Sequence, residues 1–91
     1  MSDQYFINRQ NKLRELLAKN NLDGMLVTNL IHIRYLCGFT GSAGSLVLTN
    51  NSCDFITDGR YTFQSKNEVK GAKTTISSDP HLNVVKKNNL L

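Results

Sequence analysis

The 91-residue sequence has no tryptophan, only one proline and only two cysteines. No window approaches the roughly 18 consecutive apolar residues that a membrane-spanning helix needs, and the first residues lack the apolar segment of a secretory signal. Cys37 and Cys53 are too far apart in sequence for a Cys-x-x-Cys zinc or redox motif. These absences predict a cytoplasmic protein without a membrane partner, whose two thiols are free and most simply buried as small apolar side chains.

Acidic residues are also few. There are seven, against eleven lysines and arginines, which gives a net charge of +4. The basic residues are spread along the chain, whereas nucleic-acid-binding proteins usually concentrate them on one face or stripe. We therefore expect no nucleic-acid partner, and a small basic nucleic-acid-binding protein is the weakest alternative. A hydrophobic fraction of 40% is ordinary for a globular protein, and the length allows one domain, residues 1–91.

Hydrophobic periodicity and turn signals divide the sequence into helices and strands. The predicted elements are a helix over residues 3–20, a strand over 25–28, a helix over 30–37, a hairpin of 45–49 and 53–57, a helix over 60–70, a strand over 73–77, a turn at 78–80, and a weak helix or frayed tail over 81–91. This order predicts an α/β fold in which helices flank a mixed β-sheet. Asn50-Asn51 predicts a hairpin turn with left-handed angles, which asparagine tolerates.

The first helix and the first strand have the clearest apolar patterns. Phe6, Leu13, Leu16 and Leu17 fall on one face of the helix, and the three leucines are expected to form its buried stripe. The strand over 25–28 is almost entirely apolar, which suits a strand covered on both faces.

A loop with three glycines, Gly38, Gly41 and Gly44, joins the second helix to the hairpin. Gly38 stands where a C-cap glycine belongs, and Gly41 and Gly44 indicate left-handed angles or a close approach of the backbone. A phosphate-binding loop would need a lysine after the last glycine, and a dinucleotide site would need a helix after the loop. We therefore expect a structural loop that connects helix to strand.

Residues of catalytic type do not form a recognisable pattern. The sequence contains no His-Glu-x-x-His motif and no tight acidic cluster. His32 lies between two isoleucines of a predicted helix and is expected at the surface or a rim. Ser42 lies in the glycine loop, but its neighbours do not form the Gly-x-Ser-x-Gly elbow of a serine hydrolase. We predict no catalytic and no metal-binding residue in this chain.

Arg60 and Tyr61 follow Asp58, which is predicted to cap the helix over 60–70. The positive end of the helix dipole opposes a guanidinium in the first turn. Arg60 is therefore expected to make a specific contact. The alternatives are an internal pair with Asp58 or Glu68, and a contact with a substrate or a second subunit.

Two segments, IRYLCGFTGSAG at 33–44 and FITDGRYTFQSKNEV at 55–69, are specific as an ordered pair. Together they resemble the amino-terminal domain of the creatinase/prolidase/aminopeptidase P family, and most closely that of bacterial Xaa-Pro aminopeptidases. The resemblance runs from about residue 13 to about residue 72. Cys37, where the family usually has threonine, and Phe63, at a position that is often polar, depart from the pattern without disturbing it.

The resemblance implies a parent enzyme that is a metal-dependent hydrolase and releases the amino-terminal residue preceding proline. In the family, a carboxyl-terminal pita-bread domain holds two divalent metal ions, commonly manganese. No segment of this chain matches those ligand motifs, so the chain is expected to be inactive alone. In the family the amino-terminal domain runs on past the position of residue 91, so this chain is also expected to lack the end of its own domain. Xaa-Pro dipeptidases, or prolidases, share the domain. A stand-alone, non-enzymatic interaction module is a further alternative.

In the family this domain supports a homodimer or homotetramer and borders the active-site cleft. The implied partners are the catalytic domain of the same chain, a second copy and a proline-containing peptide substrate. Phe39, Arg60 and Tyr61 are the cleft or interface candidates, since aromatic residues beside an arginine are typical of contact hot spots. The alternative for Phe39 and Tyr61 is that both belong to the core.

Overall fold

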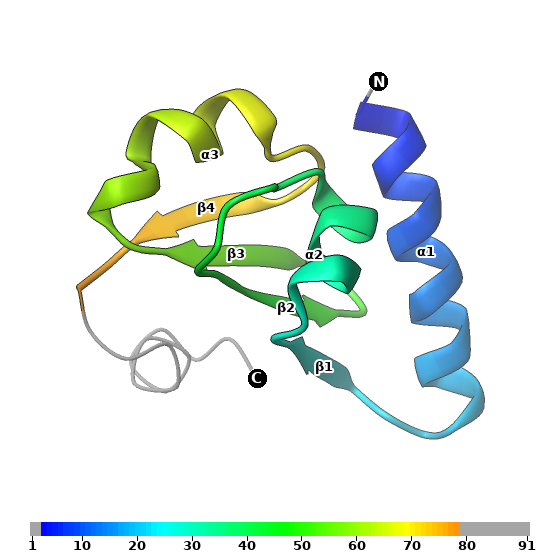
Figure 1. The fold of residues 1–91 in the computed structure, drawn as a ribbon. Coiled ribbons are helices and arrows are strands. Elements are labelled where there is room, and N and C mark those ends of the chain that lie inside the picture. Colours follow the sequence, from blue (N-terminus) through cyan, green and yellow to red (C-terminus); the bar gives the residue numbers. More distant parts are fainter. Residues whose placement is uncertain (1–2, 79–91) are drawn as a thin grey trace.

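A computed structural model describes residues 3–78, which form three α-helices and four strands. In chain order the elements are α1 Asp3–Lys19, β1 Gly24–Val27, α2 Leu30–Cys37, β2 Ser45–Thr49, β3 Cys53–Thr57, a 3₁₀ turn Gly59–Tyr61, α3 Thr62–Glu68 and β4 Lys73–Ile76 (Figure 1). Every element predicted before residue 78 is therefore present. The turn predicted at 78–80 reaches past Ser78, and it and the tail predicted over 81–91 fall outside the described residues.

The strands form one sheet in the order β1-β2-β3-β4. β1, β2 and β3 are antiparallel neighbours, joined between β2 and β3 by the predicted hairpin, with Leu48 opposite Cys53. β4 runs parallel to β3, because the connection through α3 returns the chain to the same end of the sheet. The prediction of a mixed sheet with helices in an α/β fold is confirmed.

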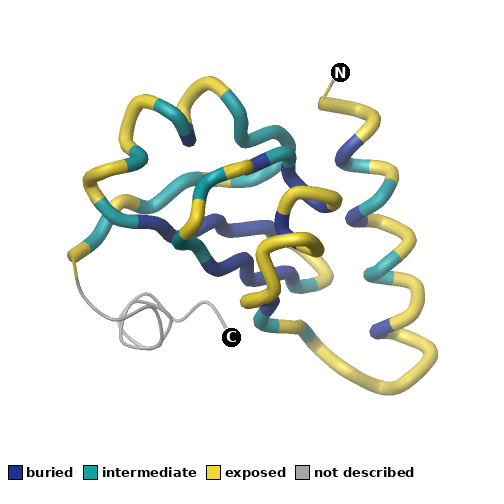
Figure 2. The backbone as a smooth tube through the Cα atoms, in the orientation of Figure 1, coloured by how far each residue is buried: buried dark blue, intermediate teal, exposed yellow. Residues whose placement is uncertain are grey.

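The main core lies between one face of the sheet and the helices, and the buried positions are concentrated on β2 and β3 (Figures 1 and 2). Leu46, Leu48 and Phe55 are fully buried there, against Ile33 of α2 and Leu17 of α1. Val47 and Ile56 point to the opposite face and form a smaller buried cluster with Leu26 beside it. Burial on both faces explains why β2 and β3 read as continuous apolar runs.

The buried stripe of α1 differs from the prediction. Leu17 is buried, but the side chain of Leu16 is 58% exposed, and the polar residue Gln10 is only 1% exposed. Gln10 Nε2 donates hydrogen bonds to the carbonyl oxygens of Leu36, at 3.0 Å, and Lys70, at 3.4 Å. The buried side-chain amide of Gln10 is therefore satisfied by backbone carbonyl groups that have no partner within a helix or a strand. Apolar periodicity does not reveal such a role.

β1 is covered only in part, so the prediction of burial on both faces fails at its start. The side chain of Met25 is 43% exposed, whereas that of Val27, on the same face, is 7% exposed. β1 also lies at the edge of the described sheet, where it pairs only with β2. An apolar run of four residues does not distinguish an edge strand from a central one.

The predicted end signals of α2 are confirmed. Asn29 Oδ1 accepts hydrogen bonds from the amides of Ile31, at 2.9 Å, and His32, at 3.2 Å. Gly38 ends the helix with φ of 87°, a left-handed angle that favours glycine.

The hairpin turn and the third helix differ in detail. Asn50 and Asn51 do not have positive φ; instead Thr49 Oγ1 accepts hydrogen bonds from the amides of Asn51 and Ser52. A hydroxyl of the preceding residue thus closes the turn. The helix predicted over 60–70 is a 3₁₀ turn followed by α3, which ends at Glu68.

Candidate functional site

The glycine loop and the 3₁₀ turn meet around three aromatic rings. The ring centroid of Phe39 lies 4.5 Å from that of Phe55 and 5.3 Å from that of Tyr61, which it meets edge to face. The side chain of Phe39 is 1% exposed. Phe39 is therefore a core residue and presents no surface for the predicted interface contact, whereas Tyr61 is half-buried at the edge of the core.

Gly41 and Gly44, the two loop glycines that follow Gly38, allow the backbone to lie close to these rings. Neither Gly41 nor Gly44 has a positive φ, so left-handed angles do not explain them. A Cβ on Gly41 would lie 2.8 Å from Tyr61 Cε1 and closer still to the ring of Phe39. A Cβ on Gly44 would lie 2.7 Å from Phe55 Cε1. The close approach considered in the sequence analysis is the correct alternative. We call Phe39, Gly41, Gly44, Phe55 and Tyr61 the aromatic junction.

The hydroxyl of Tyr61 ties the 3₁₀ turn to the glycine loop. Ser42 Oγ lies 2.5 Å from the Tyr61 hydroxyl oxygen, and the amide of Ser42 donates to the same oxygen at 3.2 Å. The hydrogen bond with the Ser42 side chain and then that from its amide lower the pKa of Tyr61 below its usual value.

Arg60 pairs with the residue that caps its own turn. Its guanidinium lies 2.7 Å from Asp58 Oδ2, and Asp58 Oδ1 also accepts from the amide of Arg60 at 3.0 Å. The side-chain hydrogen bond to Asp58 raises the pKa of Arg60. The side chain of Arg60 is nevertheless 67% exposed. Asp58 thus acts as the predicted cap and supplies the internal pair, while the outer side of the guanidinium remains at the surface.

Glu68 fastens the loop to the end of α3. Its carboxylate accepts hydrogen bonds from the amide of Thr40, at 2.8 Å, from the Thr40 hydroxyl and from Gln64 Nε2. Burial alone would raise the pKa of Glu68, but the hydrogen bonds from Thr40 and Gln64 outweigh it, and the pKa is lowered. The middle of the loop is therefore held at two points, by Glu68 at Thr40 and by Tyr61 at Ser42.

The cysteines do not offer a reactive thiol. Cys37 and Cys53 are both buried and free. Desolvation by burial raises the pKa of Cys37 to about 11 and that of Cys53 to about 12. Such thiols remain protonated at neutral pH, and a protonated thiol is a poor nucleophile and metal ligand.

Residues 3–78 contain no group of three histidine, cysteine, aspartate or glutamate side chains that could hold a metal ion. His32 is exposed on α2, as the sequence predicts. Within the same residues, none of the helices has the length and apolar character to cross a membrane.

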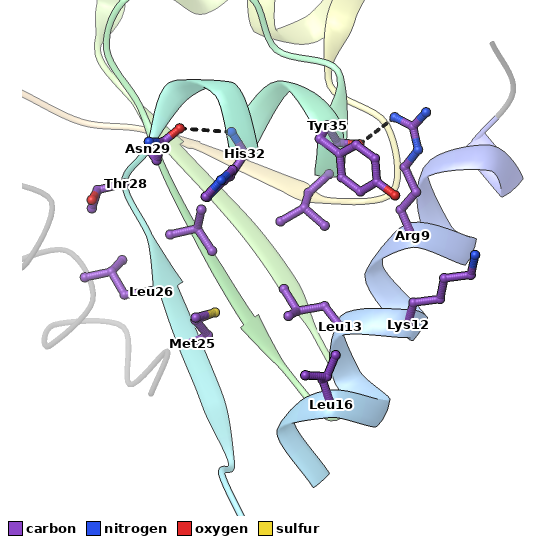
Figure 3. A pocket seen from close by; sticks show the side chains of 12 residues that line it. Arg9, Lys12, Leu13, Leu16, Met25, Leu26, Thr28, Asn29, His32 and Tyr35 are labelled. Atoms are coloured by element: carbon purple, nitrogen blue, oxygen red, sulfur yellow. Dashed lines mark hydrogen bonds between the residues drawn. The ribbon is translucent and has the colours of Figure 1, made fainter. Parts of the chain in front are cut away.

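Sequence reasoning missed a second feature, a groove between α1, β1 and α2 with a volume of about 560 Å³ (Figure 3). We call it the α1–α2 groove, and its lining residues are Arg9, Lys12, Leu13, Leu16, Met25, Leu26, Val27, Thr28, Asn29, His32, Tyr35 and Leu36. Figure 3 shows Leu13 and Leu16 on the α1 side and Met25 on the β1 side. The signal for this groove in the sequence is apolar residues that the core does not bury, such as Leu16 on α1 and Met25 on β1.

The chain matches one protein family. The family model described as the Creatinase/Prolidase N-terminal domain matches residues 9–89. A curated relative, the uncharacterized peptidase YqhT of Bacillus subtilis, is 52% identical over 60 residues. That alignment covers 66% of this chain and 17% of the relative, so the chain spans a small part of that protein's length.

Solved structures of related enzymes have the same fold. An Xaa-Pro aminopeptidase of Streptococcus pyogenes matches with a TM-score of 0.81 and 28% identity, over 96% of this chain and 70% of that chain. An Xaa-Pro dipeptidase of Bacillus anthracis matches with a TM-score of 0.84 and 29% identity, over 93% and 24%. An X-prolyl aminopeptidase of Caenorhabditis elegans, described as a cytosolic enzyme with a di-nuclear active site, matches with a TM-score of 0.69 and 26% identity, over 82% and 16%.

Proposed function

The chain belongs to the creatinase/prolidase N-terminal domain family, and from this premise we propose that it is the non-catalytic amino-terminal part of a longer Xaa-Pro aminopeptidase. The proposed activity of the parent is hydrolysis of the bond between the first residue of a peptide and a following proline. The observation that carries this proposal is the family match over residues 9–89, together with the peptidase relatives. An Xaa-Pro dipeptidase is the second candidate, favoured by the likeness to the Bacillus anthracis enzyme.

The described residues do not fit a catalytic metal centre. No three ligand side chains gather within residues 3–78, and both thiols are held in their protonated form by burial. We therefore place the chemistry in a carboxyl-terminal domain of the parent, where two divalent ions, manganese in our proposal, would activate water and stabilise the developing charge. The proposed location is the cytoplasm, which agrees with the description of the Caenorhabditis elegans neighbour as cytosolic.

The proposed role of this part is to support assembly and to border the cleft. Phe39 is excluded as a contact residue by its burial, so the surface that we propose for the contact is formed by Arg60 and the exposed edge of Tyr61. The guanidinium carbon of Arg60 lies 5.2 Å from the centroid of the Tyr61 ring, which places a cation and an aromatic ring side by side.

The experiment compares the 91-residue chain with the protein encoded by its whole open reading frame. Both are assayed with manganese on an Xaa-Pro tripeptide and an Xaa-Pro dipeptide. We expect the longer protein to release the first residue of the tripeptide and the 91-residue chain to release none. Turnover of the dipeptide alone would select the dipeptidase. Metal-dependent turnover by the pure 91-residue chain, or no Xaa-Pro hydrolysis by the longer protein, would contradict the proposal.

A further inference from the structure

The helices of the described chain all pack against the same face of the sheet. Besides residues of the strands, the main core contains residues of α1, of α2, of the glycine loop and of the two turns that flank α3. The smaller cluster on the opposite face contains Leu26 of β1, Val47 of β2 and Ile56 of β3. Within residues 3–78, therefore, no helix contributes an apolar side chain to that opposite face.

Side chains on the opposite face are nevertheless buried. Val47 and Ile56 are both 0% exposed, and Asp54 is 7% exposed. Asp54 points to the same face as Val47, because it stands opposite Val47 in the β2–β3 ladder and alternates with Cys53 and Phe55 of the main core. An apolar sheet face needs a covering layer. We call this surface the second sheet face, and it consists of Leu26, Val47, Asp54 and Ile56.

The carboxylate of Asp54 restricts what the covering layer can be. Asp54 makes no hydrogen bond and no ion pair with a residue of the described chain. Lys73 stands opposite it on β4, but the side chain of Lys73 is exposed. A carboxylate with so little access to water is costly unless a cation or hydrogen-bond donors accompany it. The covering layer therefore combines apolar side chains with cationic or donor groups.

The chain that follows β4 is long enough to supply this layer. The amide of Ser77 donates to the carbonyl oxygen of Thr57 at 2.9 Å, so the described chain leaves the sheet beside β3, one strand away from Ile56. The sheet has four strands, and its outer strands lie about 14 Å apart at roughly 4.8 Å for each spacing. Even at the helical rise of about 1.5 Å per residue, residues 81–91 would span about 16 Å.

The composition of residues 81–91 is complementary to the second sheet face. The apolar residues of this segment are Leu82, Val84, Val85, Leu90 and Leu91. The segment contains no acidic residue, and it contains two lysines, Lys86 and Lys87. Its apolar side chains can contact Val47 and Ile56, and a lysine can supply the cation that Asp54 needs.

We propose that residues 81–91 cover the second sheet face. The apolar side chains of this segment pack on Leu26, Val47 and Ile56, and one of its two lysines lies beside Asp54. The sheet is then the middle layer of the domain, with α1, α2 and α3 on one side and this segment on the other. The proposal does not depend on the activity of the parent protein, because both contacting surfaces belong to this chain.

The test uses the 91-residue chain with isotopically labelled methyl groups on leucine, valine and isoleucine. We expect nuclear Overhauser effects between the methyl groups of Val47 or Ile56 and those of Leu82 or Val85. A mixture of labelled and unlabelled chains, filtered for effects between chains, should give none. Absence of these effects within one chain would overturn the proposal. Their appearance only between chains would do the same and would show that a second copy covers the face.

A double variant tests whether the segment shields the sheet. Leu82→Asp combined with Val85→Asp places two charges at apolar positions of the segment, which should detach it from the second sheet face. A soluble paramagnetic agent should then relax the methyl groups of Val47 and Ile56 as strongly as those of Leu16, which is 58% exposed. Unchanged protection of Val47 and Ile56 in this variant would overturn the proposal.

The matched control is Asn83→Asp combined with Asn88→Asp, which adds the same two charges at polar positions of the segment. The control should leave the second sheet face protected, and exposure equal to that in the double variant would overturn the proposal. The methyl groups of Leu48, which is 0% exposed in the main core, should stay protected in both proteins. If Leu48 loses its protection in the double variant, the Overhauser effects of the unsubstituted chain decide.

Discussion

The aromatic junction and the α1–α2 groove are both lined by large apolar side chains, yet one is closed and the other open. In the junction, Phe39 and Phe55 are 1% and 0% exposed, whereas in the groove Leu16 and Met25 are 58% and 43% exposed. The difference lies in what surrounds them. Two glycines without Cβ atoms let the loop lie directly on the rings, and no comparable segment of the described chain lies over the groove. Apolar content alone therefore does not determine which surface folding closes.

The largest expected effect comes from a truncation at the centre of each region. Phe39→Ala should destabilise the chain by about 3–5 kcal/mol, because it removes a buried ring that contacts two others. Leu16→Ala should change the free energy of unfolding by no more than about 0.5 kcal/mol, because the side chain already lies largely in water. Urea denaturation of both variants measures the contrast. Similar midpoints for the two would show that the junction is not a tighter part of the core than the groove.

The next effect concerns the glycines of the junction. Gly41→Ala and Gly44→Ala should each destabilise by about 1–3 kcal/mol, because the added methyl group would overlap a ring that the core holds in place. Gly59→Ala is the matched control, since a Cβ there would meet nothing within 4 Å and φ is not left-handed. It should be neutral or stabilising by up to about 1 kcal/mol. Unchanged midpoints for both junction variants would show that the rings can move aside.

Features of the fold that depend on neighbouring residues could be predicted from the sequence, whereas features that depend on distant residues could not. The order of the elements, the Asn29 and Gly38 caps and the buried strands β2 and β3 follow from local patterns, because each depends on neighbouring residues. The reason for Gly41 and Gly44 does not, since it depends on Phe55 and Tyr61, which lie on later elements. Sequence alone left close approach and left-handed angles open as alternatives.

Errors in the prediction of burial have a related cause. Leu16 and Gln10 both lie on α1. The predicted buried stripe includes Leu16 and omits Gln10, because Gln10 is polar, although it follows Phe6 and precedes Leu13 and Leu17 at helical spacing. In the structure Leu16 is exposed and Gln10 is buried, because Gln10 faces carbonyl groups left unpaired at the end of α2 and after α3. Where a helix meets irregular backbone, hydrogen bonding decides which side chain is buried, and a one-dimensional apolar pattern does not record that.

A smaller effect is expected from Glu68, which holds the loop beside the junction. Its pKa is lowered from 4.5 in the folded chain, so the unfolded chain binds the proton more tightly. The stability contributed by its hydrogen bonds is fully present above about pH 4.5 and is lost as pH falls through the folded pKa. Glu68→Gln should therefore flatten the decline in unfolding midpoint between about pH 6 and about pH 3. The control, Glu15→Gln on the exposed side of α1, should show the same decline in unfolding midpoint as the unsubstituted 91-residue chain. An equal decline in all three proteins would contradict the role of Glu68.

The smallest effect on folding is expected from Arg60→Ala, which asks whether the surface beside the junction has a partner. The side chain of Arg60 is 67% exposed and donates two hydrogen bonds to Asp58, so the two residues form a surface ion pair of the kind that contributes little to folding. The thermal midpoint of the 91-residue chain should therefore not change measurably. In the longer protein, the same change should lower the oligomer mass or the rate of Xaa-Pro hydrolysis, because it removes a cation beside an exposed aromatic edge. Lys66→Ala, which removes the same charge from exposed α3, should alter neither. If Arg60→Ala lowers the midpoint of the chain and leaves assembly and turnover intact, Arg60 serves the fold and the proposed contact surface is wrong.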